Sequence, residues 1–250
     1  MIIRVAHLYP EYLNIYADRG NIAVFEHRAA ARGHELAIDE ITVGTPFAPG
    51  QHDLVYVGGG QDREQALIAP DLAARGDGLR DAVEGGTALL AVCGGYQLLG
   101  RGYRGRGGAW MTGAGVFPLE TVAGERRMIG DVLLECELEP GRRFTVAGFE
   151  NHAGRTYLDP GARALGRVVA GFGNDGSSGA EGCTVQRALG TYLHGPLLPR
   201  NPELADLILS WALAHAGGDD PEPLEPLPDE LERTAHAVAS GRARLRGGRR

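Results

Sequence analysis

The chain has 250 residues, of which 43% are hydrophobic, and a formal net charge of −7 at pH 7. Its length and apolar content allow one large domain with a sizeable core, and the negative charge argues against a nucleic-acid-binding protein, which usually carries a basic face. The three scattered cysteines fit neither a disulfide framework nor a zinc site, and no apolar run is long enough to span a bilayer. With no signal-peptide pattern at the N-terminus, we expect a cytoplasmic protein without a metal or other cofactor.

Short apolar runs alternate with amphipathic stretches along most of the chain, which predicts an α/β fold with an open, mostly parallel sheet flanked by helices. The predicted strands cover residues 2–8, 35–43, 53–57 and 87–92. The predicted helices cover residues 21–32, 73–84 and 202–216, and another helix begins at 96–99. Residues 128–170 are expected to form strands and turns, and residues 181–193 two more strands that lead to a histidine.

The composition changes after Gly217. Residues 217–230 (GGDDPEPLEPLPDE) are acidic and rich in proline, which is typical of a linker. A short helix is expected over residues 231–244, followed by an arginine-rich, frayed end. The sequence therefore predicts one domain over residues 1–217 and an extension over residues 218–250.

Cys93 stands where the buried strand 87–92 passes into a helix, with two glycines directly after it. This pattern is typical of a nucleophile elbow, in which small residues relieve crowding around a tight turn and leave the reactive side chain accessible. The start of a helix also stabilises a thiolate. We therefore predict that Cys93 is a nucleophile. Cys136 and Cys183 lie among apolar neighbours and are expected to be packing residues.

A cysteine nucleophile needs a base, and His194 is the best candidate among the eight histidines. It follows an apolar run and precedes Gly195-Pro196, so it is expected at the exit of a strand, on the edge where α/β active sites form. A run of three glycines at 58–60 follows another buried strand. Its flexible backbone can direct N–H groups at a developing negative charge, so we predict an oxyanion hole formed by Gly59, Gly60 and Gly94.

The motifs GGG at 58–60, CGGYQ at 93–97 and HG at 194–195 resemble, in this order, those of the class I (triad-type) glutamine amidotransferases. The stretch GFENHAGRT at 148–156 makes the cobyric acid synthase-like branch the nearer match. This resemblance covers about residues 1–215. It implies a flavodoxin-like domain that attacks the side-chain amide of glutamine with Cys93, forms a thioester and releases ammonia.

Within that branch the chain is most similar to the stand-alone glutaminase subunits of lipid II isoglutaminyl synthase. This match depends on LYPEYLNIYADRGN at 8–21, GGGQDREQ at 58–65 and ERRMIGDV at 125–132. The resemblance implies a heterodimer with a Mur-ligase-like, ATP-dependent subunit that amidates the D-glutamate of lipid II, a peptidoglycan precursor. Because the chain contains no lysine, it contains no P-loop, and the amide-forming half is expected on the partner.

Two residues are candidates for binding the amino-acid end of glutamine. Arg127 in the RMIG match is the predicted carboxylate clamp, since a guanidinium meets a carboxylate with two bonds; the alternative is a solvated arginine beside Arg126. Gln97, one helical turn after the nucleophile, either bonds the same end of the substrate or lies on the helix surface. Glu150 and His152 belong to the family signature, and both are expected to shape the pocket.

The sequence departs from the wider family at two positions. Ala91 stands where a glycine usually precedes the nucleophile, and Pro196 stands where a glutamate usually orients the histidine. A Cys–His dyad is therefore expected, with no third member named. The alternatives left open are a glutaminase for another acceptor such as cobyrinate, a non-catalytic binding module of the same fold, and a cysteine hydrolase on the same scaffold.

Overall fold

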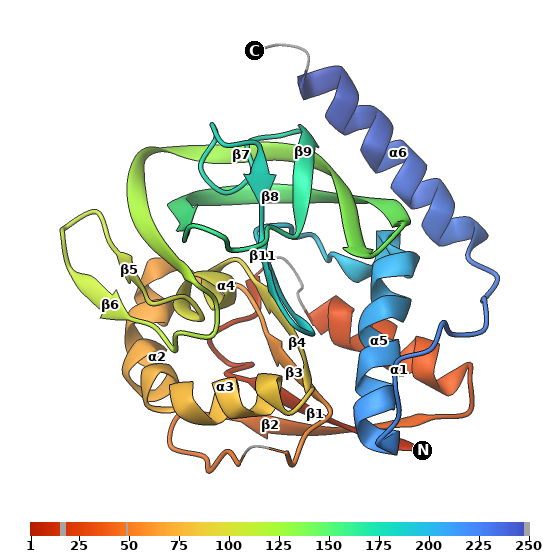
Figure 1. Cartoon of the computed structure of the whole chain (residues 1–250). Helices are drawn as coiled ribbons and strands as arrows, with labels where there is room; N and C mark the ends of the chain where they lie inside the picture. The colour runs from red at the N-terminus through yellow and green to blue at the C-terminus, as the bar shows by residue number, and fades with distance from the viewer. Residues whose placement is uncertain (16–18, 49, 248–250) are drawn as a thin grey trace.

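The computed structural model describes residues 1–15, 19–48 and 50–247; residues 16–18, which form part of the N-terminal match, lie outside them. In the described chain, a six-stranded sheet has the order β11-β12-β4-β3-β1-β2 (Figure 1). All of its neighbouring strands are parallel except β11 and β12. The strands are β1 (Ile2–Leu8), β2 (Glu35–Ile41), β3 (Leu54–Val57), β4 (Ala88–Val92), β11 (Cys183–Val185) and β12 (Ala188–Thr191).

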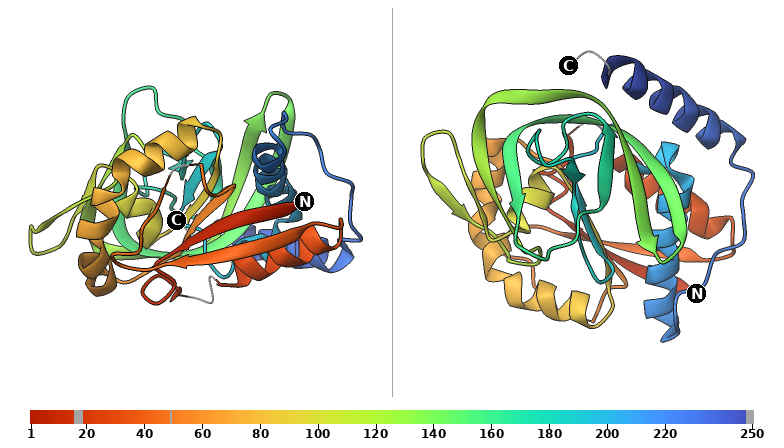
Figure 2. Two further views of the ribbon diagram at one scale, coloured as in Figure 1. Left: turned by 90° about the horizontal axis from the view of Figure 1, so that it is seen from below. Right: turned by 45° about the horizontal axis from the view of Figure 1, so that its top comes forward.

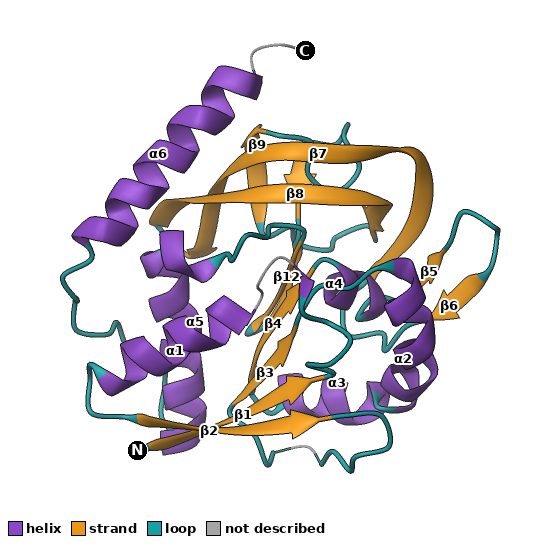
Figure 3. Cartoon of the chain, turned by 180° about the vertical axis from the view of Figure 1, so that it is seen from behind, coloured by secondary structure: helices purple, strands orange, loops and turns teal. Residues whose placement is uncertain are grey.

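Helices cover both faces of this sheet, as Figure 3 shows from behind. The helices α1 (Arg19–Ala30) and α5 (Pro202–Gly217) lie on one face; α2 (Asp62–Ala74), α3 (Gly76–Glu84) and α4 (Gly94–Leu98) lie on the other. Every residue of β3 and β4 is buried between the two layers, which explains their uninterrupted apolar sequences. The predicted mostly parallel, helix-flanked sheet is thus confirmed.

A second sheet, mainly antiparallel, packs beyond the carboxyl ends of the parallel strands (Figure 1). Two long strands dominate it and pair with each other along most of their length. The strands are β5 (Gly102–Arg104), β6 (Trp110–Thr112), β7 (Leu119–Glu139), β8 (Arg142–Leu158), β9 (Gly166–Ala170) and β10 (Ala180–Glu181). Strands were expected in much of this region, but the pattern of single runs could not show that they form a separate sheet.

The C-terminal extension ends in α6 (Glu230–Gly247), which packs against β7, β8 and β9. In the tilted view of Figure 2, α6 lies beside the β7–β8 ribbon, on the side away from α2 and α3. Arg28 of α1 joins this extension to the rest of the chain: its guanidinium contacts Asp206 at 2.6 Å and Asp229 at 2.7 Å. The helix expected over residues 231–244 is present and continues to Gly247.

The main helix that the sequence did not predict is α2. Pro70 lies inside it, and a proline normally ends a helix because it lacks an N–H group and crowds the preceding turn. Here the helix persists because Gln65, Ile68 and Leu72 are buried on one side of it. The predicted helix 73–84 consequently appears as α3 alone, beginning at Gly76. No described helix is both long and apolar enough to cross a membrane.

Candidate active site

Cys93 occupies a strained turn between β4 and α4. Its φ of +48° and ψ of −104° lie in a region that residues other than glycine rarely adopt. The next two residues must be small: a Cβ on Gly94 would lie 2.8 Å from the Gly60 nitrogen, and one on Gly95 would lie 2.7 Å from the Gly58 oxygen. The predicted elbow is therefore present, and it packs directly against the three-glycine loop.

The three-glycine loop follows β3, next to the elbow. The Gly95 N–H donates to the Gly58 carbonyl at 3.1 Å, and the Ile15 N–H donates to the Gly59 carbonyl at 3.1 Å. These bonds fix two carbonyls of the loop against the protein. Gly60 lines the same cavity as Cys93. Gly59 and Gly94 lie beside it but are not among its lining residues.

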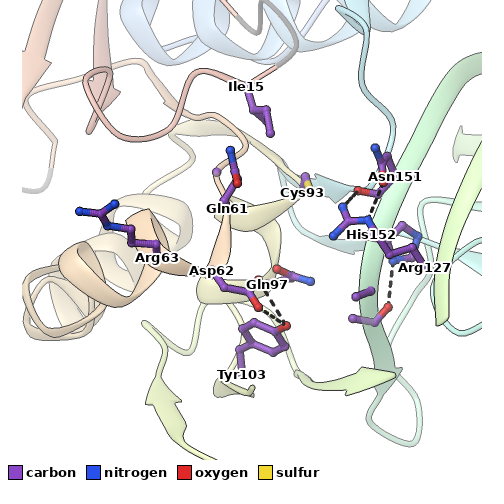
Figure 4. Close-up of a pocket in the computed structure, with 13 residues that line it drawn as sticks. Ile15, Gln61, Asp62, Arg63, Cys93, Gln97, Tyr103, Arg127, Asn151 and His152 are labelled. Carbon is purple, nitrogen blue, oxygen red and sulfur yellow. Dashed lines mark hydrogen bonds between the residues drawn. The ribbon is translucent and has the colours of Figure 1, made fainter. Parts of the chain in front are cut away.

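A cavity of about 520 Å³ opens at Cys93 (Figure 4). One wall comes from the loop and helix after β3, and the opposite wall comes from β7 and β8 (Figure 4). The lining residues are Ile15, Gly60, Gln61, Asp62, Arg63, Cys93, Gln97, Tyr103, Arg127, Asn151, His152, Ala153 and Gly154. The cavity therefore joins the predicted nucleophile to both predicted substrate-binding residues.

Arg127 reaches the cavity from β7, where it is held by β8. Its Nε donates to the Asn151 side-chain oxygen at 2.8 Å, and its Nη2 donates to the Asn151 carbonyl at 2.8 Å. Arg126 is also exposed but does not line the cavity. The two arginines lie in an irregular stretch of the β7–β8 ladder between Ala123 and Met128, so strict alternation of side chains does not govern them.

Gln97 is buried below Cys93, which excludes the helix-surface alternative. Its amide oxygen accepts a bond from Gln65 at 2.8 Å, and its amide nitrogen donates to the Tyr192 hydroxyl at 3.0 Å. The Tyr192 hydroxyl also bonds the Thr156 hydroxyl at 2.6 Å. Gln97 therefore has a fixed orientation where it meets the cavity.

His194 lies just beyond the end of β12, the strand that pairs in parallel with β4. The Cys93 N–H donates to the Thr191 carbonyl at 2.7 Å, so the two chain segments run side by side at this edge. His194 is buried, and its main chain pairs with Phe149 of β8 through N···O distances of 2.8 and 3.3 Å. It is not a lining residue of the cavity. It lies at the sheet edge where the sequence predicted it.

Glu150 and His152 are buried on the inner side of β8. The His152 ring stacks on the Tyr192 ring, with centroids 3.5 Å apart, and its Nδ1 bonds the Gly154 carbonyl at 2.8 Å. Burial lowers the pKa of His152, so the neutral ring is favoured at neutral pH. The Glu150 carboxylate accepts from the N–H groups of Phe172 and Gly173. His152 therefore lines the cavity next to Tyr192, and Glu150 holds the main chain at Phe172 and Gly173.

Several charged and polar residues of the cavity were not predicted from the sequence. Asp62 faces the Tyr103 hydroxyl at 3.4 Å, and burial, together with the Asp62 charge, raises the pKa of Tyr103 to about 12. Arg63 and Gln61 follow the three-glycine loop directly, and this position was the available signal. Another missed residue is Glu181, a fully buried carboxyl bonded to the segment before His194.

Comparison with known proteins gives one family for most of the chain. Residues 4–202 match the CobB/CobQ-like glutamine amidotransferase domain. The chain is 37% identical over 243 residues to a lipid II isoglutaminyl synthase (glutamine-hydrolyzing) subunit GatD from Staphylococcus aureus, with 96% of each chain covered. It is 36% identical over 219 residues to the same-named subunit from Streptococcus pneumoniae, covering 87% of this chain and 83% of that one.

Cobyric acid synthases are more distant relatives. The one from Caulobacter is 33% identical over 201 residues, which cover 75% of this chain but 38% of that protein. Among solved structures, the PurLQS structure from Thermotoga maritima has a chain that matches with a TM-score of 0.54 and 16% identity, covering 85% of this chain and 96% of that one. At this identity the structural match supports the fold alone.

Proposed function

Because the chain belongs to the CobB/CobQ-like glutamine amidotransferase family, we propose that it is the glutaminase subunit of a lipid II isoglutaminyl synthase. The observation that carries the proposal is a cysteine on a strained elbow, in a cavity whose walls hold both a guanidinium and a carboxylate. Arg127 and Asp62 lie on opposite sides of Cys93 (Figure 4). These two charges suit the carboxylate and ammonium of a free amino acid.

The reaction proceeds in two steps. The Cys93 thiolate attacks the side-chain amide carbon of glutamine; a C–S bond forms, the C–N bond breaks, and the nitrogen leaves as ammonia with a proton from His194. The N–H groups of Gly59, Gly60 and Gly94 stabilise the negative oxygen of the tetrahedral intermediate. Water, deprotonated by His194, then attacks the thioester, and glutamate leaves as the C–S bond breaks.

The ammonia passes to a partner chain. A Mur-ligase-like subunit activates the D-glutamate of lipid II with ATP, and ammonia replaces the activating group, so the two chains form a heterodimer in the cytoplasm. Both GatD relatives carry the word subunit in their names, and the match to the Staphylococcus aureus protein covers 96% of each chain. Service to cobyrinate is less well supported, because the cobyric acid synthases match over a small share of their own length.

The test is recovery of the partner from the native host with a tagged chain, followed by reconstitution. We expect an ATP-dependent ligase to co-purify, and the pair to amidate lipid II with glutamine as nitrogen donor. Cys93→Ala should abolish glutamine use while added ammonium salts still support amidation. A partner that amidates cobyrinate and leaves lipid II unchanged would refute the assignment of the acceptor. Lack of glutamine hydrolysis by the complex would instead favour a binding module.

A further inference from the structure

The segment between β12 and His194 is held by side chains. Tyr192 and Leu193 belong to no strand, so their N–H groups need other acceptors. The Tyr192 N–H donates to Glu181 Oε1 at 2.6 Å, and the Leu193 N–H donates to the Thr191 hydroxyl oxygen at 3.1 Å. The His194 N–H donates to the Phe149 carbonyl at 2.8 Å. All three successive amides are therefore fixed.

Glu181 is the centre of this arrangement. Besides accepting from Tyr192, its carboxylate accepts from the Thr191 hydroxyl, with distances of 3.0 and 3.2 Å to its two oxygens. Because the Thr191 hydroxyl in turn accepts from Leu193, the carboxylate holds one amide directly and the next through one intermediate. The Thr191 carbonyl accepts the Cys93 N–H at 2.7 Å. The same short segment thus connects the nucleophile to the residue proposed as its base.

Such a carboxyl is expensive to retain in a protein core. Glu181 is fully buried, and in the described part of the chain no arginine or histidine forms an ion pair with it. Burial, and in addition the charge of nearby Glu150, disfavours the ionised form of Glu181. Burial of an ionisable group without a counter-charge is unfavourable, so an apolar residue would stabilise the fold better if packing were the only role.

We propose that Glu181 is a positioning residue for glutamine hydrolysis, which fixes the main chain of residues 191–193 and thereby the spacing of Cys93 and His194. It supplies this constraint in a chain that has Pro196 where the wider family has a glutamate next to the histidine. The inference rests on the proposed function, since positioning has a meaning only if Cys93 and His194 react with glutamine. Glu181 itself lines no part of the cavity, so it acts through the segment that it holds.

The experiment measures glutamine hydrolysis by the complex recovered from the native host, with variants of this chain. Glu181→Met keeps the length of the side chain and removes its acceptors; Glu181→Gln keeps one oxygen for the Tyr192 N–H. We expect the methionine variant to lose about 10- to 100-fold in kcat, the scale of a small misplacement of reacting groups, with an unchanged half-saturating glutamine concentration. The Glu181→Gln variant should therefore lose less of its kcat than Glu181→Met.

Thr191→Val is the second variant, and it decides the question if Glu181→Met does not fold. It removes the hydroxyl that transmits the constraint to Leu193, so it should lower kcat in the same way. Thr184→Val is the matched control: Thr184 lies on β11, beside β12, and its hydroxyl donates to the Arg163 carbonyl, away from Cys93 and from residues 191–194. Its kcat should be that of the wild type.

Labelling of Cys93 by a glutamine-analogue electrophile separates a failure of the proposed function from a failure of the proposed role of Glu181. If the wild-type chain is not labelled at Cys93 and does not hydrolyse glutamine, both the proposed function and the proposed role of Glu181 are refuted. An active wild type together with a folded Glu181→Met, or a folded Thr191→Val, that has full kcat overturns the role of Glu181 alone. Slower labelling and lower kcat in these two variants, with normal labelling in Thr184→Val, supports it.

Discussion

Arg127 and Asn151 are joined by two hydrogen bonds of 2.8 Å, one to the side-chain oxygen and one to the carbonyl of Asn151. They hold the guanidinium of an exposed arginine at the wall of the cavity. We expect Arg127→Ala to raise the half-saturating glutamine concentration about 10- to 100-fold, because a hydrogen bond to a charged group contributes roughly 1.5–3 kcal/mol. Steady-state kinetics of glutamine hydrolysis would measure this.

Arg126→Ala is the internal control for that measurement. Arg127 lines the cavity and Arg126 does not. The half-saturating glutamine concentration of Arg126→Ala should therefore match that of the wild type. A defect in Arg126→Ala with none in Arg127→Ala would mean that Arg126, and not Arg127, binds the glutamine carboxylate. Equal and mild effects in both variants would indicate a diffuse electrostatic contribution instead of a clamp.

Labelling by an electrophile should be confined to one of the three cysteines. Burial raises the pKa of both Cys136 and Cys183 to about 12, so at neutral pH these two thiols carry almost no reactive thiolate. We expect mass spectrometry of the labelled, folded chain to find the adduct on Cys93 alone, and Cys93→Ser to show none. Adducts on Cys183 at a comparable rate would contradict this reading of the site.

Removal of the histidine should affect the rate strongly. His194→Ala is expected to lower glutamine hydrolysis by about 10²–10⁴-fold, the usual contribution of general acid–base catalysis. The stability of the variant, followed by thermal unfolding, should show that it folds. A variant in which Cys93 still reacts with the glutamine analogue at the wild-type rate would mean that His194 does not activate the nucleophile.

The stability of the fold should depend on Arg28. Its side chain is 3% exposed and pairs with Asp206 and Asp229. Arg28→Ala removes a buried partner from both carboxylates, of which Asp206 keeps a contact with Arg32 at 2.9 Å, so the free energy of unfolding should fall by about 3–5 kcal/mol in denaturant titrations. Arg143→Ala, which breaks the exposed pair with Glu137, is the control and should change little. Equal stability in both variants would show that the buried pairs contribute nothing.

Glu181 should leave a signature in the pH dependence of stability. Burial raises its pKa from 4.5 to about 8. Between these values the unfolded chain has released a proton that the folded chain keeps, so the favourable contribution is full below the lower pKa and is lost as the pH rises through the upper one. The stability of the wild type relative to Glu181→Gln should therefore fall by up to about 1.4 kcal/mol per pH unit in this window.

Chemical denaturation at several pH values measures that difference. The titratable groups near Glu181 are Tyr96, Cys136 and Glu150. Burial raises the pKa of Tyr96 and of Cys136, so both keep their protons throughout the window. A difference between the two proteins that does not change with pH would mean that Glu181 is already ionised at acidic pH.

The sequence predicted the parallel sheet and the nucleophile elbow because both produce local patterns. Uninterrupted apolar runs correspond to β3 and β4, and Cys93 followed by two glycines corresponds to the strained turn. The second sheet was not predicted as a unit, because long antiparallel strands with an irregular ladder carry no single period. The helix α2 was not predicted; it contains Pro70, a residue that normally ends a helix.

The supporting residues of the site were harder to predict than the reacting ones. Glu181 lies at most twelve residues before the segment 191–193 that it holds. Nothing in EGCTVQ, however, distinguishes a buried carboxyl group from a surface one. Gln97 was recognised from its motif, but its contacts with Gln65 and Tyr192 join three distant stretches of chain. Such contacts arise only when α2, α4 and the segment after β12 come together in the folded chain. The division of the chain at Gly217 stays a prediction.

The positive φ of Cys93 means that the stability of the fold and the activity of the enzyme favour different residues at position 93. A glycine adopts this conformation without strain, whereas any other residue there lowers the free energy of unfolding by about 1–3 kcal/mol. The substitution that relaxes the fold most directly at this turn is therefore one that removes the nucleophile. A library of this protein screened for heat resistance alone should enrich inactive chains with glycine at position 93, so stabilised variants that remain useful have to be selected for turnover at every round.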